Sequence, residues 1–332
     1  MRRPDLSKKL CIYFILFIFI PSMLTGCSER NDPLPAEPPV NIQASEESTG
    51  TNSNLPDKTE QTEELSADGN LTEDTVPVME EVDWSGYFDE INGAAVLYDP
   101  MENRYQIYHQ ELASTRRSPC STFKIISSLV ALEHGIIDPE DSVRTWNGET
   151  YWNEEWNRNI DFSDAFHASC VWYFREVIDD IGEELMQEEL NRLSYGNCDI
   201  SDWNGHLNTN NSNPALTGFW IESSLLISPM EQAEVMERIF GEHTVCSEET
   251  HHQLEQVMRL ADQEKTGLSV YGKTGMGKTD GAVVDAWFTG FADDADRRIY
   301  FCVYMGKTDN QKVSSARARE TAVKIISDYL SE

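Results

Sequence analysis

Alternating and helical patterns of apolar residues begin only about 80 residues into the chain. Two β-type runs at 93–98 and 105–108 flank a turn-rich segment, which predicts a hairpin. Helical spacing of apolar residues predicts a helix over 123–133. Further helices are expected at 229–240, 247–261 and 314–330, and further strands at 268–274, 283–291 and 298–305. This order predicts an α/β (α+β type) fold, an antiparallel sheet flanked by helices with a helical subdomain within 138–222.

The first 26 residues have the pattern of an export signal. Basic residues precede an apolar run at 10–24, which is shorter than the about 20 residues of a membrane-spanning helix. The run ends in Leu24-Thr25-Gly26-Cys27, which resembles the lipobox of bacterial lipoproteins. We therefore expect cleavage before Cys27, lipidation of its thiol and an extracytoplasmic protein anchored to a bacterial membrane. An uncleaved anchor helix is the alternative.

Residues 27–80 have the composition of a disordered linker. Positions 28–80 contain no aromatic residue, six prolines and thirteen acidic side chains against two basic ones. Such a segment cannot bury enough apolar surface to offset the entropy lost on ordering. It is expected to act as an acidic tether, which leaves 81–332 as a folded catalytic or binding domain.

The charge of the chain restricts its partners. A formal net charge of -32 opposes nonspecific attraction to nucleic acid, which we do not expect as a partner. The eight Trp, twelve Tyr and thirteen Phe require a core to cover them, so the chain is not wholly disordered.

Five cysteines remain after Cys11 and Cys27 are set aside, namely Cys120, Cys170, Cys198, Cys246 and Cys302. The number is odd, so at least one thiol is free, and we expect mostly reduced, buried thiols. No Cys-x-x-Cys spacing occurs, and His251-His252 lacks partners at metal-ligand spacing. No metal site is expected.

Residues 272–279 fit the phosphate-loop expression G-x-x-x-x-G-K-T. That loop requires a helix directly after it, because the amides at the helix start bind the phosphates. Here 280–288 is predicted to be a turn followed by a strand. We therefore do not expect nucleotide binding.

Ser121-Thr122-Phe123-Lys124 stands at the start of the helix predicted over 123–133. The i,i+3 spacing places the Ser121 hydroxyl and the Lys124 amine on one face, one turn apart. Serine is a poor nucleophile until a neighbour removes its proton, and lysine can do so only if it is neutral or converted to another base. The pair is a candidate nucleophile and base, although Ser-x-x-K alone is a weak signal.

Further short motifs follow in order, namely Ser169-Cys170-Val171, Tyr195-Gly196-Asn197, Phe219-Trp220 and Lys273-Thr274-Gly275. Together with Ser-x-x-K they resemble the penicillin-recognising serine enzymes, and within them the class D (oxacillinase-type) β-lactamases. The resemblance spans about 93–330. The second motif reads Ser-Cys-Val and not Ser-x-Asn, Gln187 stands where the class A deacylating glutamate would be, and Ala286 replaces a more usual glycine. We expect no deacylating glutamate.

The resemblance implies roles for the catalytic residues. Ser121 would attack the lactam carbonyl and form an acyl-enzyme, with the backbone amides of Ser121 and Met276 as the oxyanion hole. Ser169 and Lys273 would relay the proton to the leaving nitrogen.

The resemblance also implies how the substrate is held. Thr274 and a cation from Arg319 would bind the substrate carboxylate. Arg317 is the alternative cation, because the alignment of this sequence with the family pattern can shift by two residues at this point. Val171 would contact the substrate.

No separate cofactor is expected, but Lys124 would be N-carboxylated by CO2. Walls formed by Phe123, Val171 and Ile221 would favour the neutral amine, and the indole N–H of Trp220 would hold the carbamate. This carbamate would serve as the base in both acylation and deacylation.

The expected function is hydrolysis of β-lactam antibiotics. Two alternatives keep the same acyl-enzyme without efficient turnover: a β-lactam sensor domain and a penicillin-binding D,D-peptidase. The sequence leaves the preferred β-lactams and the oligomeric state open.

Overall fold

The computed structural model describes residues 76–332 except 208–211, 261–267, 296, 309–311 and 332. Its centre is a six-stranded sheet in the order β1-β3-β2-β6-β5-β4. The strands are β1 (Val78–Glu81), β2 (Gly93–Asp99), β3 (Arg104–Tyr108), β4 (Ser269–Thr279), β5 (Ala282–Asp294) and β6 (Arg297–Gly306). Strands from both ends of the described chain therefore meet in one sheet, with β2 paired to β6.

The sheet is antiparallel except at one edge, where β1 runs parallel to β3. Val78 to Glu81 pair with Arg104 to Ile107, so residues 78–80, which the prediction placed in the linker, belong to the sheet. The side chains of β1 are mostly exposed. Because this strand is held mainly through its backbone, its sequence carries no hydrophobic pattern that could have marked it.

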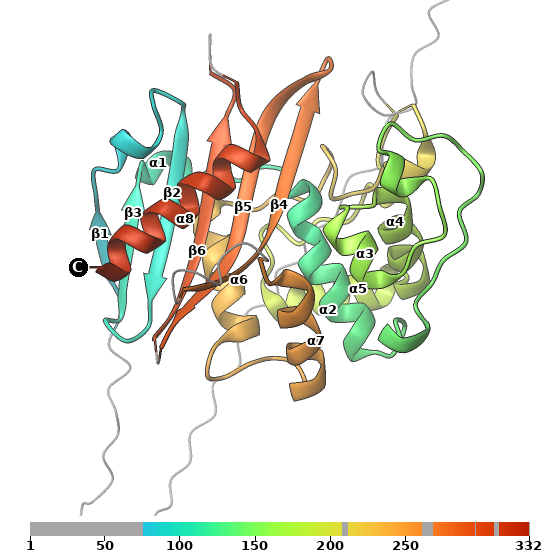
Figure 1. The fold of residues 1–332 in the computed structure, drawn as a ribbon, viewed down its shortest axis with the longest axis horizontal. Coiled ribbons are helices and arrows are strands. Elements are labelled where there is room, and N and C mark those ends of the chain that lie inside the picture. The colour runs from blue at the N-terminus through green and yellow to red at the C-terminus, as the bar shows by residue number, and fades with distance from the viewer. Residues whose placement is uncertain (1–75, 208–211, 261–267, 296, 309–311, 332) are drawn as a thin grey trace, which may run out of the picture. The chain divides into compact units, whose positions relative to one another are not determined.

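Helices lie on both faces of the sheet and beyond its β4 edge (Figure 1). They are α1 (Gln110–Ala113), α2 (Lys124–Glu133), α3 (Phe162–His167), α4 (Val171–Ile181), α5 (Glu183–Leu193), α6 (Pro229–Phe240), α7 (Glu248–Met258) and α8 (Ser315–Ser331). Single 3-10 turns are η1 (Ser85–Tyr87), η2 (Cys120–Phe123), η3 (Pro139–Asp141), η4 (Glu154–Trp156) and η5 (Pro214–Leu216). The predicted helical subdomain is therefore confirmed as α3 to α5 with their loops.

The alternation of strand side chains explains the two covered faces. In β5, Phe288 packs in the core beneath α8, whereas its neighbour Trp287 packs in the cluster that includes Ala233 of α6. Successive strand residues point to opposite faces. A near-continuous apolar strand such as β5 therefore needs a helix on each side, and α8 and α6 provide them.

The phosphate-loop match at 272–279 lies entirely within β4, and a turn follows it. Asp280 and Gly281 have φ values of 49° and 76°, and β5 begins at Ala282. Two consecutive residues of positive φ are typical of a tight hairpin turn between antiparallel strands. The predicted turn and strand are confirmed, so the helix that a phosphate loop requires does not follow.

None of the five described cysteines forms a disulfide, as expected. Cys120, Cys170 and Cys302 are buried.

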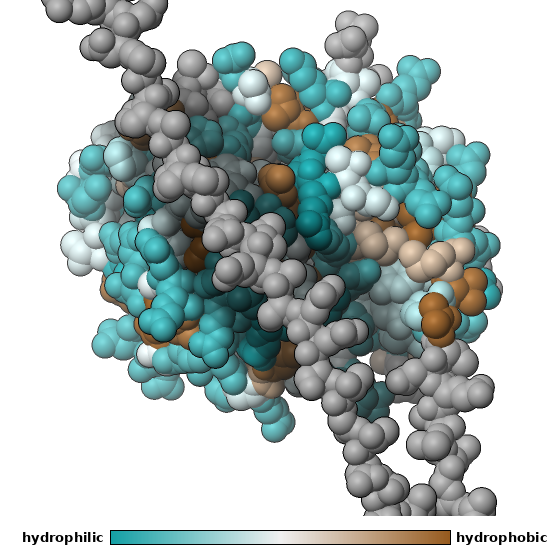
Figure 2. Space-filling model, turned by 180° about the vertical axis from the view of Figure 1, so that it is seen from behind, coloured by the Kyte–Doolittle hydropathy of each residue, from teal (hydrophilic) through white to brown (hydrophobic). Residues whose placement is uncertain are grey.

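Within the described ranges, the helices lack the length and apolar character that a membrane span requires. The predicted signal, Cys27 and most of the predicted linker lie outside the described residues. The described surface seen from behind is mostly hydrophilic with separate small apolar areas (Figure 2).

Candidate active site

Ser121 lies in the short 3-10 turn η2 that leads directly into α2. Pro119 precedes this turn, and proline is well suited to a helix start because it lacks the N–H that would be left unpaired there. The Lys124 amine donates a hydrogen bond to the Ser121 hydroxyl, with Nζ and Oγ 3.1 Å apart. The predicted nucleophile and base are therefore in direct contact.

Lys124 is fully buried, with 0% of its surface exposed. Burial lowers the pKa of its amine to about 8, because the charged form loses its hydration. Nζ lies 5.3 Å from the centre of the Phe174 ring on α4. Phe174 was missed by the sequence reasoning, although its position one helical turn after Val171 could have indicated it.

Ser169 and Lys273 form a second hydroxyl–amine pair. Lys273 Nζ donates to Ser169 Oγ at 3.1 Å and to the Thr274 carbonyl at 3.2 Å. Burial, with a smaller contribution from the charge of Lys124, holds the pKa of Lys273 well below its usual range. Two buried lysines, each bonded to a serine, are thus available for proton transfer.

The edge position of β4 explains how its residues reach the nucleophile. β4 is an edge strand that pairs along its length with β5. In the described residues its other side is bridged near its start, at Tyr271 by Arg259, so alternate backbone amides farther along the strand point away from the sheet. A Cβ on Gly275 would lie 2.9 Å from the Pro119 carbonyl oxygen and 3.0 Å from Thr122. Glycine therefore permits close packing of β4 against the nucleophile turn, beside Met276.

Ser169 and Cys120, the residue before the nucleophile, adopt a left-handed backbone conformation. Cys120, directly before Ser121, has φ 50°, and Ser169 has φ 54°. Such conformations cost about 1–3 kcal/mol in a residue with a side chain and cluster at active sites. Their presence on both sides of the site indicates that the packing around it fixes these two turns.

A pocket of about 250 Å³ opens over these groups. Among the predicted site residues, Ser121, Ser169, Val171, Thr274 and Met276 line it. Its wall also contains residues that the sequence reasoning did not assign to it, which are Cys120, Trp152, Trp156, Ala168, Leu216, Glu222, Gly275, Lys278 and Ser315. These residues come from η2, η4, η5, β4, α8 and the loops between such elements, and no local pattern specifies how such separate segments meet in space.

Glu222 is a glutamate at the site that the sequence reasoning did not name. It lies two residues after Trp220 and lines the pocket. Its Oε1 accepts a hydrogen bond from the Lys278 backbone at 2.5 Å. Its own backbone N–H donates to the Ser118 hydroxyl at 2.8 Å. Glu222 thus joins the end of β4 to the segment before Ser121, a relationship between distant segments that spacing could not reveal.

Trp220 is buried behind the pocket wall, with 1% of its surface exposed. Its ring stacks on Phe123, with centroids 6.0 Å apart. Its carbonyl accepts from Cys120 N and from Ser118 Oγ, both at 2.9 Å. Within the described ranges, no residue accepts a hydrogen bond from its indole N–H.

Neither candidate cation for the substrate carboxylate lines the pocket. Arg317 forms an ion pair with Asp89 at 2.8 Å. Arg319 makes no ion pair with any residue that the structure describes. It lies four residues after Ser315, so the two share a face of α8, and Ser315 lines the pocket. The face of α8 that points towards the site is therefore that of Arg319.

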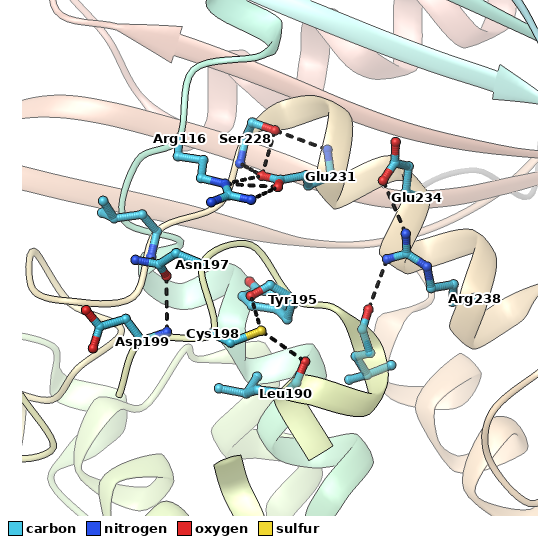
Figure 3. A network of polar contacts seen from close by, with 12 residues as sticks. Arg116, Leu190, Tyr195, Asn197, Cys198, Asp199, Ser228, Glu231, Glu234 and Arg238 are labelled. Carbon is cyan, nitrogen blue, oxygen red and sulfur yellow. Dashed lines mark hydrogen bonds and ion pairs between the residues drawn. The ribbon is translucent and has the colours of Figure 1, made fainter. Parts of the chain in front are cut away.

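The Tyr195-Gly196-Asn197 motif follows α5, and its Tyr195 and Asn197 belong to the polar network drawn in Figure 3. Asn197 Oδ1 accepts from Leu226 N at 2.8 Å, and its Nδ2 donates to the Ser224 carbonyl at 2.8 Å. Gly196 has φ 55°, and a Cβ there would lie 2.0 Å from the Leu226 carbonyl oxygen. The motif thus anchors the loop that carries Trp220 and Glu222.

A model of the family described as "Transpeptidase: Penicillin binding protein transpeptidase domain" matches residues 93–327. Regulatory protein BlaR1 of Bacillus licheniformis is 31% identical over 250 residues, which are 75% of this chain and 39% of that protein. Probable β-lactamase YbxI of Bacillus subtilis (strain 168) is 30% identical over 242 residues, 73% of this chain and 82% of that protein. The chain thus spans about two fifths of BlaR1 and most of YbxI.

Solved structures show the same similarity. The C-terminal domain of the Bacillus licheniformis BlaR penicillin-receptor has a TM-score of 0.66 at 30% identity, covering 76% of this chain and 97% of that one. A class D β-lactamase from Bacillus subtilis has a TM-score of 0.64 at 29% identity, covering 75% of this chain and 95% of that one. The chain therefore belongs to the penicillin-binding protein transpeptidase family, in the group that contains the class D β-lactamases and the BlaR penicillin-receptor domain.

Proposed function

We propose that this chain hydrolyses β-lactams through an acyl-enzyme on Ser121, with a carboxylated Lys124 as the general base. The observation that carries the proposal is the 3.1 Å hydrogen bond between a fully buried lysine and the candidate nucleophile. The similarity to YbxI, a probable β-lactamase, supports the same reaction class.

Carboxylation of Lys124 follows from its environment. A pKa of about 8 leaves an appreciable fraction of neutral amine near neutral pH. The neutral amine attacks the carbon of CO2, loses one proton to solvent and becomes a negatively charged carbamate. The indole N–H of Trp220 is the proposed hydrogen-bond donor to this carbamate.

In acylation, the carbamate removes the proton of Ser121 as its Oγ attacks the lactam carbonyl. The developing oxyanion is bound by the backbone amides of Ser121 and Met276, which are fixed in advance by η2 and the edge of β4. The lactam C–N bond breaks, and the nitrogen takes its proton through the Ser169–Lys273 pair. Thr274 and Arg319 hold the substrate carboxylate.

In deacylation, the carbamate takes a proton from water, and the resulting hydroxide attacks the ester carbonyl. The C–O bond to Ser121 breaks, the protonated carbamate returns its proton to the Ser121 oxygen, and the open-ring acid leaves. Glu222 is a weaker candidate for this base, because its Oε1 is engaged by the Lys278 backbone.

A sensor function is the second candidate, and the match to BlaR1 favours it. In that case Ser121 is acylated but the ester persists. A penicillin-binding D,D-peptidase would likewise retain a long-lived penicilloyl ester.

Turnover of a chromogenic cephalosporin by the purified chain tests the proposal, together with intact-mass analysis after mixing with a penicillin. Hydrolysis over many cycles supports the β-lactamase. A stable adduct on Ser121 without turnover supports the sensor or the peptidase. Absence of both an adduct and turnover would refute the whole proposal.

A further inference from the structure

Arg175 on α4 is a nearly buried cation that contacts two indole rings. Its guanidinium carbon lies 5.5 Å from the Trp203 ring centre and 5.4 Å from the Trp220 ring centre. The residue is 7% exposed. Both separations are within the about 6 Å over which a cation is attracted to an aromatic face.

Hydrogen bonds fix the orientation of this guanidinium. Nη1 donates to the Trp203 carbonyl at 2.9 Å, and Nε donates to Asp179 Oδ2 at 3.1 Å. A second bond joins Nη2 to Asp179. Because the guanidinium is planar and its donors form a rigid fork, these bonds determine which way its two flat faces point. The two indoles are therefore held at defined positions.

The Arg175–Trp220 contact is linked to the reacting groups in two ways. The Trp220 ring stacks on Phe123, the neighbour of Lys124 in the chain, and the Trp220 carbonyl accepts from Cys120, the neighbour of Ser121. The residue before Arg175, Phe174, packs its ring against the Lys124 amine. One turn of α4 thus contacts the Lys124 amine through Phe174 and the Trp220 ring through Arg175.

We propose that Arg175 is a positioning residue that fixes the Trp220 indole beside Lys124 and thereby sets the lifetime of the acyl-enzyme. This inference rests on the proposed role of Trp220 in holding the carbamate. Arg175 does not line the pocket in the described part of the chain, so it acts through Trp220 and not on the substrate.

Two substitutions separate the contribution of the Arg175 charge from that of its planar hydrogen-bonding group. Arg175→Gln removes the cation, whereas Arg175→Lys keeps the charge but loses the planar fork. Asp179 is 51% exposed at its side chain, so it remains solvated in both variants. The matched control is Arg144→Gln. Arg144 also lies over an α4 aromatic ring, 5.3 Å from the centre of Tyr173, and pairs with the half-exposed Asp180 at 2.6 Å.

The first measurement reads the indole position without any reaction. The full chain is labelled with 5-fluorotryptophan, and the fluorine resonance of Trp220 is assigned from a Trp220→Phe variant. Both Arg175 substitutions are expected to shift or broaden that resonance, while Arg144→Gln leaves it in place. An unchanged resonance in the Arg175 variants would overturn the inference.

The second measurement gives the effect of these substitutions on the acyl-enzyme. Mass spectrometry after a penicillin pulse gives the lifetime of the Ser121 adduct, whether it is short or long. Arg175→Gln is expected to lengthen this lifetime about tenfold, from the loss of one desolvated cation–ring contact, and to change the acylation rate less than about threefold. In a Trp220→Phe background the same substitution should add nothing.

Equal, independent effects in the two backgrounds would overturn the positioning role, since they would mean that Arg175 acts without Trp220. A displaced resonance with an unchanged adduct lifetime would do the same. If the wild-type chain forms no adduct with any penicillin, the proposed function fails, and the fluorine measurement alone then decides whether Arg175 positions Trp220.

Discussion

The Lys124 amine donates to the Ser121 hydroxyl across 3.1 Å, and both belong to one continuous turn at the start of α2. The first prediction follows from this contact. Ser121→Ala should abolish adduct formation because the attacking oxygen is gone. The fold should persist, since losing one hydroxyl at a helix start costs at most about 1–2 kcal/mol. Mass spectrometry with a penicillin and thermal unfolding check both statements; normal turnover would remove Ser121 from the mechanism.

The second prediction concerns CO2. With a pKa of about 8, the amine of Lys124 is mostly cationic at lower pH and increasingly neutral above it, and only the neutral amine captures CO2. Turnover should therefore fall in acidic or CO2-depleted buffer and recover when bicarbonate is added. Lys124→Ala should bind β-lactam but barely turn over. Carbon-13 spectra with labelled bicarbonate should show a carbamate; indifference to bicarbonate together with no such signal would leave Lys124 as an unmodified base.

The third prediction separates the two candidate bases of deacylation. Glu222→Gln keeps an oxygen that can accept from the Lys278 backbone, so the bond between the loop and β4 survives. We expect deacylation to slow less than tenfold, whereas loss of a true general base costs about 10²–10⁴-fold. Single-turnover measurement of deacylation decides the matter, and a loss in the larger range would assign the base to Glu222.

The fourth prediction concerns the substrate carboxylate. Arg319→Ala should raise KM for a penicillin more than it lowers kcat, because a hydrogen bond to a charged group contributes about 1.5–3 kcal/mol. Arg317→Ala is the matched control, since Arg317 pairs with Asp89 on the surface. Steady-state kinetics of the two variants compare them directly; a larger KM effect at Arg317 would reverse the assignment.

The fifth prediction concerns the membrane anchor. Cys27→Ser removes the thiol that would be lipidated, so the protein should move from the membrane fraction to a soluble or uncleaved form. Fractionation and the mass of the processed chain measure this. A variant that stays in the membrane fraction with unchanged processed mass would instead indicate an ordinary anchor helix.

Sequence patterns located most of the helices and strands, because the local signals in these segments agree with the structure that the segments adopt. The helix predicted over 229–240 is α6 itself, with a capping box formed by Ser228 and Glu231. The hairpin of β2 and β3 also matches the prediction. The patterns missed β1, whose exposed side chains give no alternation, and they gave β4 too short an extent, because its glycine-rich end resembles a loop although it pairs with β5 through Thr279.

The sequence by itself determined the Ser121–Lys124 contact, because three residues are one turn of a helix and local geometry fixes the distance between their side chains. Only the tertiary structure decided that Lys273 meets Ser169, 104 residues away in the chain. It also decided that Glu222 lines the pocket and that the Arg175 guanidinium contacts the Trp220 ring. These relationships depend on how the β4 edge, α4 and the loop after Asn197 pack together, and side chains from separate segments meet only where the burial of a shared core forces their backbones into contact.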